Sequence, residues 1–555
     1  MRPLSVGLIV CLGLLLAAVP VDAARKRERT IKDLASRPVV LDTNRKVEAG
    51  SERAMENYRR FLELQNTDPR LRAEALRRLG DLNLEGGEIE RMASEVNAID
   101  LQGAEAISLY SALLTAYPNY PRNDEVLYQL ARAYETTGQP EKALGTLDQL
   151  VSRFPTTSQL DEVQFRRGEL LFSAKNYNAA QDAYAAVIAR DSKSTFYEES
   201  LYKHGWALFK RGLNEEALPS FMGVVEQVLS DPAKPGGVKP LDKVSRAERE
   251  LVDDTLRVVS IAFSYLEGAE SVGQFLASRD DKRFAHLLYS RLGDLFVEKE
   301  RYQDGAAAYR AYVAQDPNSE FAPPLAMQAI EAYDKGGFAN LVLEGKQDFV
   351  ERYNFGTAYW QGRDPAGYEA VTSALNKSLK DVASYYHGTA QTSKKPVDYS
   401  EAARWYRTYL QSFPKDAAAA STNLLLAETL FESGDLVSAA TEFERTAYDY
   451  PKNDKSAAAA YSALVAYQRH EATLDGADKA AWNQRSIDAG VKFASAFPEH
   501  PDSGGVLTRS AEQVFALGNL PRAIELAEQV LARQPPVDVA KQRIAWTIVG
   551  QANFD

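Results

Sequence analysis

The chain has 555 residues, with 65 Lys and Arg against 77 Asp and Glu, and a formal net charge of −12 at pH 7. This acidic balance argues against nucleic acid or an anionic membrane surface as a partner, because both are negatively charged. The single cysteine excludes an internal disulfide framework, and the 45% content of hydrophobic residues is ample for a large core.

Residues 1–23 have the features of a secretory signal peptide. Arg2 gives the positive start, residues 4–19 are the apolar run, and small residues before Ala24 give a cleavage site. An uncleaved anchor is the less favoured alternative, because the apolar run is shorter than the ~20 residues of a membrane span. A lipoprotein anchor at Cys11 is rejected, since a large residue precedes this cysteine, which itself lies inside the run. We predict export to the periplasm and a mature chain without cysteine.

Residues 24–50 are predicted to form a leader. They show no helical period, and Arg25, Lys26, Arg27 and Arg29 form a basic cluster beside the cleavage site. The composition favours a solvated, flexible arm. The alternative is a docking segment that becomes ordered on a partner.

The helical part begins with a predicted helix over residues 51–64, which looks like the second helix of a leading half-repeat. The next unit carries Gly80 and Tyr110 at repeat positions. Its two halves are separated by an insertion near residues 86–103, which we expect to extend the hairpin loop on one edge.

Three copies of one helical hairpin follow each other from Leu127 to Val224. Residues of the same kind recur 37 positions apart in four columns, which indicates an internal repeat. The columns are Ala131, Gly168 and Gly205; Tyr134, Leu171 and Leu208; Ala143, Ala180 and Ala217; and Leu147, Tyr184 and Phe221. The small residues allow close helix approach, and the large ones fall on one helical face. Stop signals for the helices are Gly138, Lys175-Asn176, Gly212 and Pro155. Each unit is therefore predicted to be two antiparallel helices that bury their apolar stripes by stacking.

These units resemble the tetratricopeptide repeat (TPR), a helical hairpin of about 34 residues. The matching residues of the first copy are Leu127, Leu130, Ala131, Tyr134, Ala143, Leu147 and Pro155. Later copies match at Tyr289, Leu292, Gly293, Phe296, Tyr309 and Pro317; at Leu426, Ala427, Leu430, Ala439, Phe443 and Pro451; and at Leu507, Ala511, Ala523 and Pro535. The resemblance covers most of residues 54–555. It implies an all-α, TPR-like α-solenoid of antiparallel helix pairs that forms a right-handed superhelix.

The predicted organisation follows from where this pattern holds and where it fails. Its segments are a signal peptide (1–23), a leader (24–50), an N-terminal TPR array (51–230), a loop insertion (231–245), TPR-like repeats (246–322), an irregular helical segment rich in aromatic residues (323–399) and a C-terminal TPR array (400–555). Within the last array, a loop is expected near residues 474–479. The final helix, around Trp546, either caps the solenoid or belongs to a longer chain, and its apolar surface favours the second alternative.

No catalytic constellation is visible in the sequence. The five histidines are His204, His286, His387, His470 and His500, and no two have the spacing of a helical metal pair. The loop at Gly236 and Gly237 lacks the preceding strand of a phosphate-binding loop. We therefore predict neither an enzyme, nor a metal site, nor a cofactor, and we expect His204 to have a core or groove role.

What remains is a binding surface on the first helix of each hairpin. In TPR arrays these helices line a concave groove, and the positions three before, one after and four after the small residue face it. The residues there are Tyr128, Arg132 and Glu135; Phe165, Glu169 and Phe172; and Tyr202, Trp206 and Phe209. Exposed aromatic residues are typical of recognition surfaces. The alternative is that helix curvature or the next unit covers them.

Units that end in Phe-Pro or Tyr-Pro, such as Phe154-Pro155 and Phe413-Pro414, are similar to repeats of bacterial envelope TPR proteins. These include the Tol-Pal coordinator and the lipoprotein of outer-membrane β-barrel assembly. The likeness implies a periplasmic scaffold, either free or associated with the outer membrane, that binds envelope proteins or peptides and meets the membrane only through its partners. The alternatives are a TPR scaffold for polysaccharide export and a glycan-acting enzyme on a helical superhelix. The enzyme needs two carboxyl groups in a cleft, which no motif marks.

Overall fold

The computed structural model describes residues 50–64, 67–93, 101–234, 236–280 and 282–554. The predicted signal peptide and almost all of the predicted leader lie outside these residues. The chain divides into two compact units, the first ending at Thr157 and the second beginning at Ser158. The regular elements of the described part are all helices, and a single β-bridge joins Ser230 to Val238. The predicted all-α solenoid of helix pairs is confirmed.

The first unit consists of five described helices. They are α2 (Ser51–Leu64), α3 (Pro69–Ala93), α4 (Leu101–Ala116), α5 (Asn123–Thr136) and α6 (Pro140–Arg153). The expectation of a loop from residue 86 is wrong for residues 86–93, because α3 continues through them. Gly86 lies inside the helix rather than in a turn, with the end of the Gln102 side chain of α4 against it.

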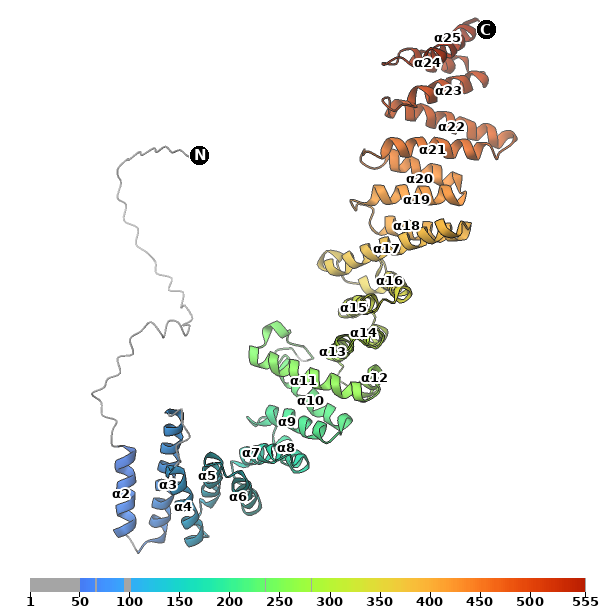
Figure 1. Cartoon of the computed structure of the whole chain (residues 1–555). Helices are drawn as coiled ribbons and strands as arrows, with labels where there is room; N and C mark the ends of the chain where they lie inside the picture. The colour runs from blue at the N-terminus through green and yellow to red at the C-terminus, as the bar shows by residue number, and fades with distance from the viewer. Residues whose placement is uncertain (1–49, 65–66, 94–100, 235, 281, 555) are drawn as a thin grey trace, which may run out of the picture. The chain divides into compact units, whose positions relative to one another are not determined.

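The second unit is a succession of helices that pack each on the next (Figure 1). Its α-helices are α7 (Leu160–Ser173), α8 (Tyr177–Arg190), α9 (Tyr197–Lys210), α10 (Asn214–Leu229), α11 (Arg246–Tyr265), α12 (Ala269–Ala277), α13 (Ala285–Glu298), α14 (Tyr302–Gln315), α15 (Ala322–Lys335), α16 (Ala339–Tyr353), α17 (Glu369–Ser393), α18 (Pro396–Ser412), α19 (Ala419–Ser433), α20 (Leu436–Tyr448), α21 (Ser456–Glu471), α22 (Gly476–Ala496), α23 (Ser503–Ala516), α24 (Leu520–Leu531) and α25 (Val539–Phe554).

The predicted repeat columns form the core of the hairpins. Ala143, Ala180 and Ala217 are fully buried. A Cβ atom added to Gly168 would lie 2.5 Å from the ring of Tyr184, so the glycine is what lets the second helix lay an aromatic ring on the first. The same pairing joins Gly205 to Phe221, Gly293 to Tyr309 and Gly80 to Tyr110. The small and large columns therefore hold each hairpin together by direct contact.

In six of the described hairpins the turn uses one left-handed residue, seven positions after the small residue. These residues are Gly138, Lys175, Gly212, Glu300, Gly434 and Gly518. Glycine adopts this conformation without strain, whereas Lys175 (φ 62°) and Glu300 (φ 59°) do so at a cost. The predicted stop at Lys175-Asn176 is confirmed, and the Asn176 side chain caps α8 by accepting from the Ala179 backbone N–H.

Two segments interrupt the regular hairpins. The predicted loop at 231–245 contains the 3-10 helix η1 (Leu241–Lys243), and it ends in a reciprocal cap in which Ser245 and Glu248 each accept a backbone N–H bond. In the predicted irregular segment, α15 and α16 form an ordinary hairpin. The departure lies in residues 354–368, which hold η2 (Ala358–Trp360) and η3 (Pro365–Gly367).

Near the C-terminal end, the predicted loop at 474–479 is shorter than expected, because α22 already begins at Gly476. On α25 the ring of Trp546 is 62% exposed. Among the described residues, no helix has both the length and the apolar character needed to cross a membrane.

Candidate partner-binding surface

The nine residues predicted to bind a partner lie on the first helices α5, α7 and α9. They are Tyr128, Arg132 and Glu135 on α5; Phe165, Glu169 and Phe172 on α7; and Tyr202, Trp206 and Phe209 on α9. Because α5 belongs to the first unit and α7 and α9 belong to the second, each set is described within its own unit.

On α5 the predicted aromatic anchor is buried. Tyr128 is 6% exposed, and Arg132 forms an ion pair with Glu88. Glu88 lies on the unpredicted extension of α3, and α3 packs against α5. Tyr128 therefore offers little surface to a partner, and the expected exposed aromatic is a core residue. Glu135 is half-buried at the end of the helix.

On α7 two aromatic rings are half-buried and one carboxylate is occupied. Phe165 packs on Phe196 with ring centroids 5.2 Å apart, and Lys203 lies 5.7 Å above the ring of Phe172. Glu169 accepts a 2.6 Å hydrogen bond from the Tyr184 hydroxyl and a 2.8 Å bond from Lys203 Nζ. Glu169 therefore joins α7 to α8 and α9, which leaves it less free to bind a partner than the sequence predicted.

On α9 the three predicted residues are half-buried aromatic rings, and Trp206 contacts both of the others. Trp206 meets Tyr202 and Phe209 edge-on, at centroid distances of 6.3 and 5.7 Å, and it rests on the buried ring of Phe221. Phe209 stacks on Tyr265 at the end of α11, a ring that is 68% exposed. We call Tyr202, Trp206, Phe209 and Tyr265 the aromatic stripe. Sequence reasoning missed Tyr265, because it lies outside the repeat columns.

A charged hollow of about 480 Å³ adjoins the aromatic stripe. This charged pocket, between α11 and α13, is lined by Asp253, Asp254, Arg257, Ser260, Arg291, Asp294, Leu295 and Glu298. Asp254 connects the two features, because it lines the pocket and accepts the hydroxyl of Tyr202. Burial and this bond raise the pKa of Tyr202 to about 12, so the phenol remains the donor near neutral pH.

The sequence carried one signal for the charged pocket. Asp294 directly follows the small residue Gly293. Glu169 and Trp206 occupy the same position after Gly168 and Gly205, and they were predicted to bind a partner for that reason. The Asp294 carboxylate accepts a 2.7 Å hydrogen bond from Tyr309. Four other lining residues belong to α11, whose hairpin departs from the repeat, and the remaining three, Arg291, Leu295 and Glu298, share α13 with Asp294. Sequence reasoning did not find these seven residues.

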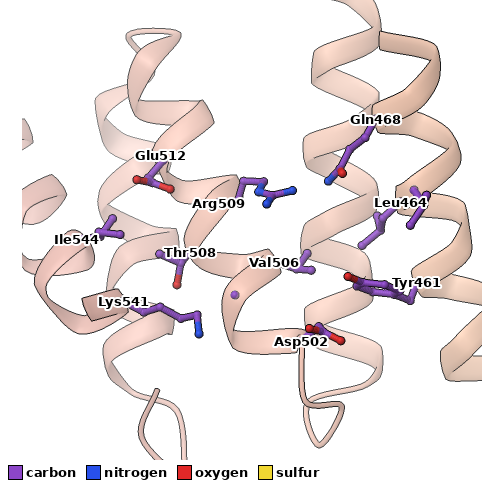
Figure 2. Close-up of a pocket in the computed structure, with 12 residues that line it drawn as sticks. Tyr461, Leu464, Gln468, Asp502, Val506, Thr508, Arg509, Glu512, Lys541 and Ile544 are labelled. Carbon is purple, nitrogen blue, oxygen red and sulfur yellow. The ribbon is translucent and has the colours of Figure 1, made fainter. Parts of the chain in front are cut away.

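A second hollow, of about 300 Å³, lies on first helices close to the C-terminal end of the second unit (Figure 2). Its walls come from α21, α23 and α25, and Gly505 leaves a gap in the side chains of α23. Figure 2 shows Arg509 and Gln468 pointing toward each other between α23 and α21. Thr508 and Glu512 line it from the positions three before and one after Ala511. The repeat register therefore locates hollows in both regions.

The five histidines are each held in a side-chain contact. His204 Nδ1 lies 2.8 Å from Ser220 Oγ, and His387 Nδ1 lies 3.1 Å from the Tyr406 hydroxyl. His286 stacks on Phe321 at 3.7 Å, and burial lowers its pKa to about 4. His470 and His500 pack against aromatic rings. The described residues contain no group of three or more His, Cys, Asp or Glu placed to hold a metal ion.

Family models and solved structures match the chain as a helical repeat protein. One model of the tetratricopeptide repeat matches residues 101–166, and a second matches residues 165–228 and 265–320. The curated proteins contain no match. Similar solved structures include MamA, with 21% identity over 34% of this chain and 90% of that one and a TM-score of 0.24. They also include a tetratricopeptide repeat protein from Parabacteroides merdae (14% identity, 54% and 98% coverage, TM-score 0.25) and the P58(IPK) TPR domain (15% identity, 82% and 99% coverage, TM-score 0.20).

Proposed function

We propose that this chain, which contains tetratricopeptide repeats, is a non-enzymatic scaffold that binds a segment of another protein along the first helices of its hairpins. The repeat fold typically serves as a non-catalytic binding scaffold, and TPR folds commonly bind protein partners. Which surface binds must be argued from its own residues, since the fold is used for many partners.

The observation that carries this proposal is the aromatic stripe. The buried Phe221 supports the rings of Tyr202 and Trp206, whereas Tyr265 keeps 68% of its surface exposed. Large aromatic side chains bury much area for little loss of conformational freedom, so they dominate the binding energy of protein interfaces. The hollow beside the stripe gives a partner side chain room to enter.

Site-specific photo-cross-linking tests this proposal. A benzophenone amino acid at position 265 should give adducts with a defined protein in the producing cell, because that side chain projects from the stripe. The control is the same amino acid at Asn178, an exposed residue of the second helix α8. Adducts at 265 but not at 178 support the proposal; adducts at neither position, or at both alike, contradict it.

We place the scaffold in the bacterial envelope, where it takes part in assembly or maintenance. Support comes from the sequence: the signal-peptide features of residues 1–23 and the Phe-Pro and Tyr-Pro unit ends. A fusion of alkaline phosphatase to the C-terminus tests the location, because this enzyme is active only after export. An active fusion whose N-terminus is near Ala24 supports the proposal. An inactive fusion that keeps Met1 contradicts it.

A further inference from the structure

Resting on the proposed function, we propose that the charged pocket receives a Lys or Arg side chain of the partner while apolar residues of the same segment lie on the aromatic stripe. The partner segment is thus a cationic one that also carries aromatic or aliphatic residues. The two features form one surface, because Asp254 lines the pocket and holds Tyr202 of the stripe.

The charges that line the pocket do not balance. Four carboxylates, Asp253, Asp254, Asp294 and Glu298, face two guanidinium groups, for a formal net charge of −2. Both guanidinium groups are already engaged within the pocket, Arg257 with Asp254 and Arg291 with Asp253.

Two carboxylates are left to act on a partner. Among the ion pairs of the described residues, none joins a Lys or Arg to Asp294 or Glu298. Asp294 accepts a bond from the neutral Tyr309 hydroxyl, and both carboxylates are exposed. The pocket therefore has unpaired negative charge that opens to the surface, which favours a cationic side chain and disfavours an anionic one.

The stripe serves the apolar residues of the segment. Lys210 Nζ lies 5.4 Å from the ring centroid of Trp206, so one face of this indole is already occupied by a cation of the chain, and the preference for positive charge rests on the pocket. Carboxylates at one end and aromatic faces at the other suit a segment in which basic and apolar residues alternate. An acidic segment meets like charges at the pocket and gains nothing from the ring faces.

The test uses the full chain and two synthetic peptides. Both contain two phenylalanines and no tryptophan, and they differ only in having three lysines or three glutamates. Binding is followed by the change in the tryptophan fluorescence of the protein when peptide is added. The variant Trp206→Phe should abolish this change, although four other tryptophans remain. The lysine peptide should bind at least 10-fold more tightly than the glutamate peptide at low salt and should weaken as salt is added.

Charge reversal identifies the site. Glu298→Lys should weaken the lysine peptide at least 10-fold, whereas Glu344→Lys, the same change at an exposed residue of the second helix α16, should alter binding less than 2-fold. The melting curve of Glu298→Lys should match that of the parent, since this side chain is exposed. Equal weakening by the two reversals, equal binding of the two peptides, or binding of neither overturns the inference. If position 265 still cross-links to a protein, the proposed scaffold function stands, and only the inference of a cationic partner segment is lost.

Discussion

The Tyr184 hydroxyl donates a 2.6 Å hydrogen bond to Glu169, and the ring of the same tyrosine covers Gly168. The arrangement recurs where an acid follows a glycine: Tyr309 bonds Asp294 beside Gly293, and Tyr110 bonds Asp81 beside Gly80. In the hairpin where Trp206 replaces the acid, Phe221 replaces the tyrosine. Glycine, acid and tyrosine thus act as one unit that joins the two helices, and without the acid no hydroxyl is needed.

Gly168→Ala should lower stability by about 1–3 kcal/mol, because the new methyl group would overlap the ring of Tyr184. The matched control is Gly388→Ala in α17, where nothing lies within 4 Å of the added atom. There the higher helix propensity of alanine should raise stability by up to about 1 kcal/mol. Denaturant unfolding followed by circular dichroism measures both. Stabilisation by both substitutions would contradict the helix contact.

Lys175→Gly should stabilise the protein by about 1 kcal/mol, because glycine adopts the observed φ of 62° without the strain of a side chain. Gly212→Ala, the converse change at the equivalent turn, should destabilise it by a similar amount. Thermal melting curves show whether each substitution raises or lowers the melting temperature. A lower melting temperature for Lys175→Gly would show that the lysine side chain makes contacts that outweigh the strain.

Stability should fall in acid partly through His286. Its folded pKa is lowered by burial to about 4, whereas an unfolded histidine titrates near 6.5. Between these two pKa values the unfolded state binds more protons than the folded state. The contribution of His286 to the free energy of unfolding is therefore complete above pH 6.5 and is lost as pH falls toward 4. His286→Gln should flatten that part of the stability profile, measured by melting between pH 4 and 7. A profile that keeps the same slope would contradict the assignment.

The sequence predicts the hairpins well because their core depends on neighbours within one unit. Ala143, Ala180 and Ala217 recur at one period and are all fully buried. Tyr128 shows the limit: it occupies the same repeat position as the half-buried Phe165 and Tyr202, yet it is only 6% exposed. Tyr265 lies outside the repeat columns because it ends α11, whose hairpin departs from the repeat. The register marks which side of a helix faces the surface, but not which residues of an irregular neighbour meet it there.

Whether the aromatic stripe binds a protein partner is tested by the affinity of the chain for the protein recovered by cross-linking at position 265. Tyr265→Ala should weaken this binding by about 1–2 kcal/mol, which is roughly 5- to 30-fold. The melting temperature should be unchanged, because the ring is 68% exposed. Val437→Ala, which removes an exposed apolar side chain from the second helix α20, should leave the affinity unchanged. Equal affinities for Tyr265→Ala and the parent would show that the aromatic stripe does not bind this partner.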